Sequence, residues 1–215
     1  MQYNIISTGS KGNAVILNNT ILIDCGVPFK AIKPYVQGLK LVLLTHEHCD
    51  HFNLATIRKL QMERPTLRFG CGKWLINKLL ACGVPTWRID VYSPNITNRY
   101  QHGFMLAMVL LHHNVPNCGY KLKIGGEKIF YATDTNDLDG IEARSYDLYM
   151  IEANYEDSEI MERISEKKLN GQYAYEYQVL HNHLSKQKAD DFIIKNAGVN
   201  SRFVYLHGHG GVNFE

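Results

Sequence analysis

The 215-residue sequence lacks any apolar stretch that approaches the ~20 residues of a membrane-spanning helix. Its first residues also lack the basic and apolar regions of a secretory signal. The five cysteines are scattered and include no C-x-x-C pair, which favours reduced thiols in a cytosolic protein over a disulfide framework. We therefore expect a cytoplasmic protein with no membrane partner.

An excess of charge of one sign is also missing. Lys and Arg together number 23 and Asp and Glu number 21, so the net charge is +2, and bulk charge gives only weak support for nucleic-acid binding. No repeat, low-complexity tract or Pro/Gly/Ser-rich linker divides the chain. We predict one domain over residues 1–215, and nothing in the sequence indicates its oligomeric state.

Short apolar segments and helical spacing together predict the order of the elements. Strands are predicted at 3–7, 14–17, 20–23, 39–44, 67–70, 104–111, 120–124, 128–132, 147–151 and 203–206. Helices are predicted at 28–37, 53–64, 73–81, 158–169 and 185–196. Strands come first and then alternate with helices, an order that predicts an α/β (α+β) fold of two mixed β-sheets with helices outside.

The most specific feature is the run 45–51, which holds three histidines and an aspartate directly after an apolar strand. Open α/β sheets usually carry their sites at the carboxyl ends of strands. Crowded imidazoles and a carboxylate are costly unless a cation offsets their repulsion and desolvation. The pattern therefore predicts metal ligands rather than a polar surface loop, and these ligands are His46, His48, Asp50 and His51.

Other predicted strands also end in a potential ligand. These further residues are His112 or His113, Asp134, and His207 or His209. The inventory suits two divalent ions: one takes three imidazoles, and the other takes two imidazoles and Asp50, with Asp134 as the bridge. Imidazole and carboxylate ligands favour Zn²⁺, with Mn²⁺ or Fe as alternatives.

Two of these positions need a choice between neighbouring histidines. Side chains alternate between the faces of a strand, so only one of His112 and His113 is expected to be a ligand. His207 ends an apolar strand directly, whereas His209 lies in a glycine-rich loop. We therefore prefer His207 to His209.

The motifs resemble those of the metallo-β-lactamase superfamily over nearly the whole chain. The segment 21–26 resembles its early strand end with an aspartate, and the histidine run matches its signature in residue type and spacing. The later motifs are matched by His113 with Gly119-Tyr120, by residues 131–135 around Asp134, and by His207. The resemblance implies a four-layer αββα sandwich with the metals at one edge, and it favours His113 over His112.

Three further features of the resemblance narrow the activity. Asp134 stands where the common antibiotic-hydrolysing lactamases place cysteine. An aspartate at this position is typical of the wider hydrolases of the superfamily. Residues 7–14 are similar to the glycine-rich opening of small exonuclease-like members. His183-Leu184-Ser185 resembles a motif of that branch and of ribonuclease Z.

The chain also departs from its relatives. Asn114 replaces the aspartate that many of them carry after the third-motif histidine. Only about fifty residues separate Asp134 from His183, which is too few for the cap of the β-CASP nucleases, and no segment offers room for the tRNA-gripping arm of ribonuclease Z. We therefore do not expect specialised tRNA processing.

The resemblance implies a dinuclear metal-dependent hydrolase, a phosphodiesterase or exonuclease on DNA or RNA that attacks with a metal-bound hydroxide. Asp50 would bind an ion and orient the water, His183 (or His181 nearby) would protonate the leaving oxygen, and Asp24 would orient a ligand imidazole. The alternatives are a hydrolase of a small ester, thioester, lactone or cyclic phosphate on the same fold, and a non-catalytic metal-binding scaffold.

Residues outside these motifs have simpler interpretations. Tyr173, Tyr175 and Tyr177 alternate in a segment that reads as a strand or loop. They could stack on bases, but we expect ordinary packing. Lys11 lies in a glycine-containing turn for which we expect a structural role, and Cys49 is expected to be a spacer that points away from the ligands.

Overall fold

The computed structural model describes residues 1–208. Within the chain, residues 1–98 and 99–215 form two compact units, and the prediction of one domain over 1–215 stays a prediction. No helix within residues 1–208 combines the length and the apolar character needed to cross a membrane.

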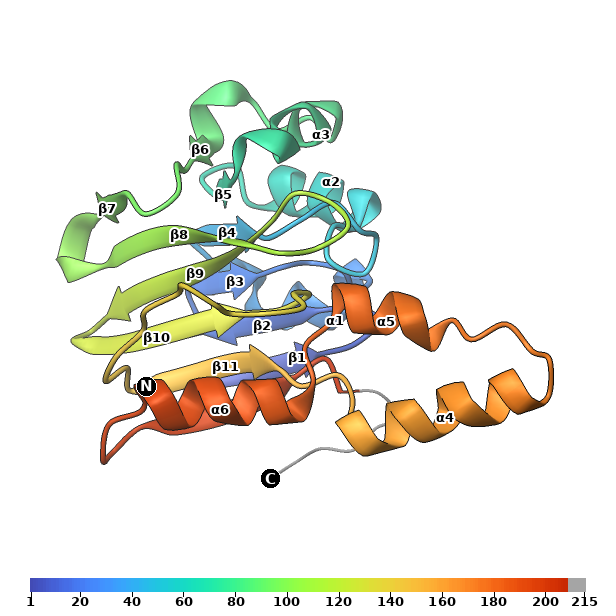
Figure 1. Ribbon diagram of the computed structural model, residues 1–215. Helices are drawn as coiled ribbons and strands as arrows, with labels where there is room; N and C mark the ends of the chain where they lie inside the picture. The colour runs from blue at the N-terminus through green and yellow to red at the C-terminus, as the bar shows by residue number, and fades with distance from the viewer. Residues whose placement is uncertain (209–215) are drawn as a thin grey trace. The chain divides into compact units, whose positions relative to one another are not determined.

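The first unit is built on a mixed six-stranded sheet (Figure 1). Its strands, in spatial order, are β1 (Tyr3–Ser7), β2 (Ala14–Leu17), β3 (Ile21–Ile23), β4 (Leu41–Leu44), β5 (Arg68–Cys71) and β6 (Ile89–Val91). The pairs β1/β2 and β2/β3 are antiparallel, and the strands from β3 to β6 are parallel. Strands β2, β3 and β4 are buried along their whole length, as their continuous aliphatic runs predict.

Three helices belong to this unit: α1 (Phe29–Ile32), α2 (Leu54–Glu63) and α3 (Ile76–Ala81). Short 3₁₀ turns cover Lys33–Gly38, Lys73–Leu75 and Thr86–Arg88. Helix α2 begins after Asn53, whose side chain accepts a hydrogen bond from the Thr56 N–H, a standard N-cap contact. Ile57 and Leu60 of this helix join the buried hydrophobic cluster beside the sheet.

The second sheet is also mixed and six-stranded. In spatial order it contains β12 (Arg202–Leu206), β11 (Leu148–Glu152), β10 (Glu127–Ala132), β9 (Asn117–Ile124), β8 (Met105–Leu111) and β7 (Thr97–Arg99), the last of which spans the boundary between the units. The strands β10, β11 and β12 are parallel, while β8/β9 and β9/β10 are antiparallel. A 3₁₀ turn covers Gln101–Gly103.

The helices of the second unit are α4 (Asp157–Leu169), α5 (Glu176–Asn182) and α6 (Lys186–Asn196). Ser185 caps α6 as predicted, because its hydroxyl accepts a hydrogen bond from the Lys188 N–H at 3.3 Å. Phe192 of α6 packs in a cluster with Phe130 and Tyr149 of the sheet.

The predicted fold class, two mixed sheets with helices, is confirmed. Strands β6 and β7 and helix α5 were not predicted. The helix predicted at 28–37 is shorter, since α1 ends at Ile32 and a 3₁₀ turn follows. Pro34 explains the change, because a proline lacks the N–H that would continue an α-helix.

Candidate metal centre

In the first unit, parallel pairing brings Asp24 to the histidine loop. Ile23 of β3 pairs with Leu43 of β4, so the residues that follow these two strands emerge at the same sheet edge. Asp24 is fully buried there. Its carboxylate accepts hydrogen bonds from the N–H and the hydroxyl of Thr45 at 2.9 and 3.0 Å and lies 2.7 Å from Nδ1 of His51.

These contacts fix the ring of His51. Burial raises the pKa of Asp24, and the charge and hydrogen bonds of His51 and Thr45 oppose that effect only in part. A histidine whose Nδ1 faces a buried carboxylate offers Nε2 to a metal, an arrangement that is common around zinc. The observed geometry therefore suits the orienting role expected of Asp24.

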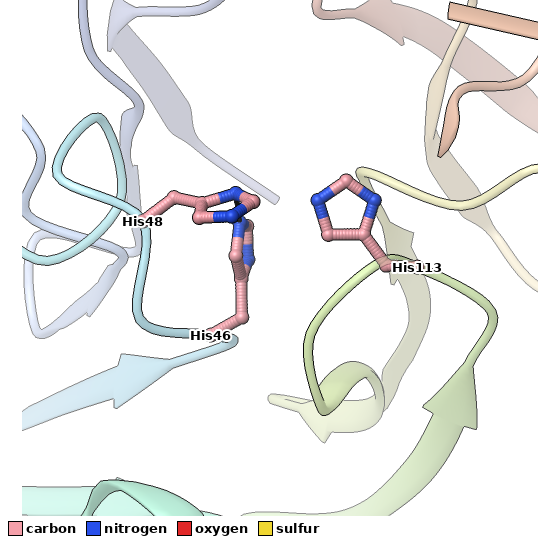
Figure 2. A group of neighbouring side chains, drawn as sticks. All are labelled: His46, His48 and His113. Atoms are coloured by element: carbon pink, nitrogen blue, oxygen red, sulfur yellow. Dashed lines mark hydrogen bonds between the residues drawn. The ribbon is translucent and has the colours of Figure 1, made fainter. Parts of the chain in front are cut away.

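The other predicted ligands of the loop lie around His51. The rings of His46 and His51 are 4.2 Å apart between centroids, and both residues are fully buried. Nε2 of His46 lies 3.1 Å from Nδ1 of His48, and Figure 2 shows the two rings next to each other. Asp50 is partly exposed, and its Oδ2 lies 3.7 Å from Nε2 of His51. The first unit thus gathers four predicted ligands, while Cys49 is exposed as expected of a spacer.

Asn13 connects the glycine-rich turn to this loop, a contact that the sequence did not predict. Its backbone N–H and its side-chain amide donate to the carbonyl of Asp50 at 2.6 and 3.2 Å. The same amide nitrogen lies 2.8 Å from Nε2 of His51, and its side-chain oxygen accepts from the Gly9 N–H. The turn is structural, as expected, and its structural role is to hold the peptide that joins two predicted ligands.

Gly26 allows this close approach. A Cβ atom at this position would lie 1.7 Å from the carbonyl oxygen of Asp50, far inside van der Waals contact. Only glycine therefore fits between the turn and the histidine loop, and this steric requirement explains the residue after Cys25.

In the second unit, three parallel strands place their last residues at a common edge. Ala132 of β10 pairs with Ile151 of β11, and Glu152 pairs with Leu206 of β12. Asp134 is the second residue after β10 and His207 is the first after β12, with Nε2 of His207 3.6 Å from Oδ1 of Asp134. Both residues are buried and have left-handed backbones, with φ of 54° and 55°. Non-glycine residues adopt this region at a cost of about 1 kcal/mol or more, and such strain concentrates at functional sites.

Glu152 is a member of this group that the sequence analysis missed. It is fully buried and accepts hydrogen bonds from the Thr135 N–H at 3.0 Å and from Nδ1 of His183 at 2.6 Å. Its Oε1 also lies 3.4 Å from Nδ1 of His207. The strand-end rule that identified Asp134 applies equally to the last residue of β11, so the signal was present in the sequence.

His183 lies beside these carboxylates. Its Nδ1 is 3.6 Å from Oδ1 of Asp134, and its ring stacks on that of His207 with 5.1 Å between centroids. Burial lowers the pKa of His183, but the charge and hydrogen bond of Glu152, together with Asp134, outweigh it and raise the pKa. One atom from each of these four residues lies within 4.8 Å of the others, a spacing compatible with a bound cation.

The neighbouring histidines His112, His113 and His181 differ in their burial. His113, on the loop after β8 (Figure 2), is partly buried with its ring 5.6 Å from that of His183, and its Nδ1 lies 3.0 Å from the carbonyl of Asn182. His112 and His181 are exposed. His113 therefore lies beside His183 in the second unit, while His209 lies outside the described residues.

Buried histidines and carboxylates at the strand ends of mixed α/β sheets define a class of metal-dependent hydrolases. A family model described as "Beta-lactamase superfamily domain" matches residues 19–190. The chain belongs to this family, and the superfamily predicted from the motifs is confirmed.

Individual relatives extend this assignment. The exodeoxyribonuclease WalJ of Streptococcus pneumoniae is 25% identical over 230 residues, which cover 97% of this chain and 81% of WalJ. The crystal structure of the metallo-β-lactamase fold protein YhfI from Bacillus subtilis matches with a TM-score of 0.72 and 18% identity, over 98% of this chain and 87% of YhfI. The short form of human tRNase Z matches with a TM-score of 0.69 and 15% identity, over 97% and 92% of the two chains. These structures show the shared fold, and the relatives include nucleases.

Proposed function

We propose that this chain is a dinuclear metal-dependent phosphodiesterase that acts on nucleic acid as an exonuclease. The observation that carries the proposal is the gathering of ligand-type side chains at strand ends in each sheet, where Asp24 and Glu152 already orient imidazoles. The exodeoxyribonuclease that covers 97% of this chain supports a nucleic-acid substrate.

The donor chemistry of both groups fits two divalent cations, with Zn²⁺ favoured over Mn²⁺ or Fe. The proposed ligands of one ion are His46, His48 and His113. Those of the other are Asp50, His51 and His207, with Asp134 as the bridge. Such ions, when bound, supply a water of lowered pKa and positive charge to offset the charge of the phosphate oxygens.

The residues of the chain have separate proposed roles. Asp50, which is partly exposed beside His51, orients the attacking water and accepts its proton. His183 donates a proton to the leaving oxygen, and Glu152 holds its ring through Nδ1. Asp24 holds the ring of His51 through Nδ1.

A single substitution tests the proposed bridge. We expect Asp134→Ala to lower the rate of bis-p-nitrophenyl phosphate hydrolysis by about 100-fold or more. Mutation of a residue that only supports a metal ligand already lowers metal affinity or activity by about 10–100-fold. Asp139→Ala is the matched control, because this aspartate is exposed in the same segment and should retain full activity. Equal activity of the two variants would remove Asp134 from the centre.

End-labelled single- and double-stranded DNA and RNA then define the substrate, because a ladder of products reports both the nucleic acid and the direction of cleavage. Turnover of a panel of lactones and thioesters with phosphodiesters untouched would instead assign the chain to small esters. A metal-loaded protein that turns over neither class would be a binding scaffold.

A further inference from the structure

Three neighbouring tyrosines in the second unit are exposed, which contradicts the packing role expected from the sequence. Tyr173, Tyr175 and Tyr177 are 75%, 44% and 52% exposed, whereas Tyr120, Tyr131 and Tyr149 of the sheet are buried. Exposed large apolar groups that gather in one place often mark an interaction site. We refer to the first three residues as the tyrosine surface.

The segment below the tyrosine surface is ordered by a small core of its own. Ile160 and Ile164 of α4 form a buried cluster with Ala174, and Val179 of α5 packs against it. Because the alternate residue Ala174 faces this core, the tyrosines on either side of it remain outside. Figure 1 shows α4, the connecting loop and α5 (orange) reaching outward beyond the end of β11.

Polar contacts hold two of the three rings. The Gln178 side-chain amide donates to the hydroxyl of Tyr173 at 3.0 Å. Nζ of Lys167 lies 4.0 Å from the centroid of the Tyr175 ring and donates to Glu176 at 2.6 Å. Tyr173 and Tyr175 are therefore held in place while they stay partly exposed, so binding a ligand to them would cost little side-chain entropy.

Helix α5 links the tyrosine surface to His183. Helix α5 carries Tyr177 and ends at Asn182, directly before His183. Its seven residues span roughly 10 Å, about the length of two or three nucleotides of a strand. The carbonyl of Asn182 also lies 3.0 Å from Nδ1 of His113. A nucleic-acid strand that runs from His183 along α5 would meet the tyrosines next.

The charges of this region indicate which part of a ligand is bound. The exposed carboxylates of α4 (Asp157, Glu159, Glu162 and Glu166) outnumber its exposed basic residues, Arg163 and Lys168, so the region is no basic patch. Phosphate contacts cannot be its main contribution. Tyrosine rings instead stack on the faces of unpaired bases, whatever their sequence.

We propose that the tyrosine surface binds the bases of a single-stranded segment of the nucleic-acid substrate by stacking. The inference rests on the proposed function, since it is the nuclease activity that gives such a strand a reason to lie along α5. It specifies the substrate class as one with unpaired bases next to the cleaved bond.

Two measurements on the same variants separate this inference from the proposed function. The first is the fluorescence anisotropy of fluorescein-labelled oligothymidylate and oligouridylate as they bind to the protein, with Asp134→Ala added to prevent cleavage. The second is hydrolysis of bis-p-nitrophenyl phosphate, which has no base, by the same tyrosine variants without Asp134→Ala.

Replacement of all three tyrosines by alanine is expected to weaken oligonucleotide binding by about 5- to 150-fold for each ring that stacks on a base. Hydrolysis of the small phosphodiester should not change. The triple Tyr→Phe variant should restore binding, because phenylalanine keeps the stacking face. Phe203→Ala is the control, since this residue is 52% exposed on β12 and its loss should have no effect. The loss in the triple variant should persist as salt is raised, because stacking is not screened as phosphate contacts are.

Equal binding by the parent and triple-alanine proteins would overturn the inference. No binding by the parent, or no rescue by phenylalanine, would also overturn it. Loss of binding with no phosphodiester hydrolysed by any form would support the inference while refuting the proposed function.

Discussion

At the scale of single residues, the candidate centre depends on side chains that hold the ligands rather than on the ligands alone. Asp24 and Glu152 are both fully buried and both face an imidazole Nδ1. Burying a carboxylate costs several kcal/mol unless partners offset it. The backbone N–H groups of Thr45 and Thr135 supply part of that offset, so each carboxylate is fixed before any ion binds.

Asn13 gives a residue-scale prediction. Asn13→Ala would leave buried groups of Gly9 and Asp50 without their side-chain partner, so we expect a loss of about 1–3 kcal/mol in the free energy of unfolding. Urea denaturation measures it. Lys11→Ala, two residues earlier and exposed, should change that free energy by less than about 0.5 kcal/mol. Equal stability of both variants would show that the turn does not anchor the histidine loop.

The sequence indicated the candidate ligands and one supporting residue, Asp24, but neither Asn13 nor Glu152. His46, His48, Asp50 and His51 follow from one local motif. The contacts of Asn13 join segments far apart in the chain, and no local pattern reports them, whereas Glu152 follows a predicted strand and was overlooked. The left-handed backbones of Asp24, Asp134 and His207 are likewise imposed by their surroundings, because local propensity disfavours them.

At the scale of elements, aliphatic runs predicted most strands correctly, whereas α5 was missed. The alternation of Tyr173, Tyr175 and Tyr177 resembles a strand, yet Tyr177 lies in a helix. The packing of Val179 on α4 explains the difference, since a tertiary contact overrides a weak local preference. The short strands β6 and β7 were missed because three residues carry little periodicity.

The cap of α6 gives a prediction at this scale. Ser185→Ala removes the hydroxyl that accepts from the Lys188 N–H and should lower the free energy of unfolding by about 1 kcal/mol. Ser165→Ala is the matched control. Ser165 is exposed inside α4 and donates to the carbonyl of Met161, where alanine should be neutral or stabilising. Thermal unfolding measures the stability of both variants. A lower stability of Ser165→Ala than of Ser185→Ala would refute this account of the cap.

At the scale of the whole molecule, each of the two sheets carries ligand-type side chains at its strand ends. The first unit holds the histidine run with Asp24, and the second holds His113, Asp134, His183 and His207 with Glu152. Neither group alone supplies every ligand of the proposed pair of ions. Metal binding should therefore depend on residues of both units.

Metal content tests this dependence most directly. After loading with zinc and removal of the excess, elemental analysis should find about two ions per chain in the parent protein and in His112→Ala. His113→Ala and Asp134→Ala should each retain fewer, because each would remove a ligand of the pair. Retention of two ions per chain by both ligand variants would contradict the proposed centre.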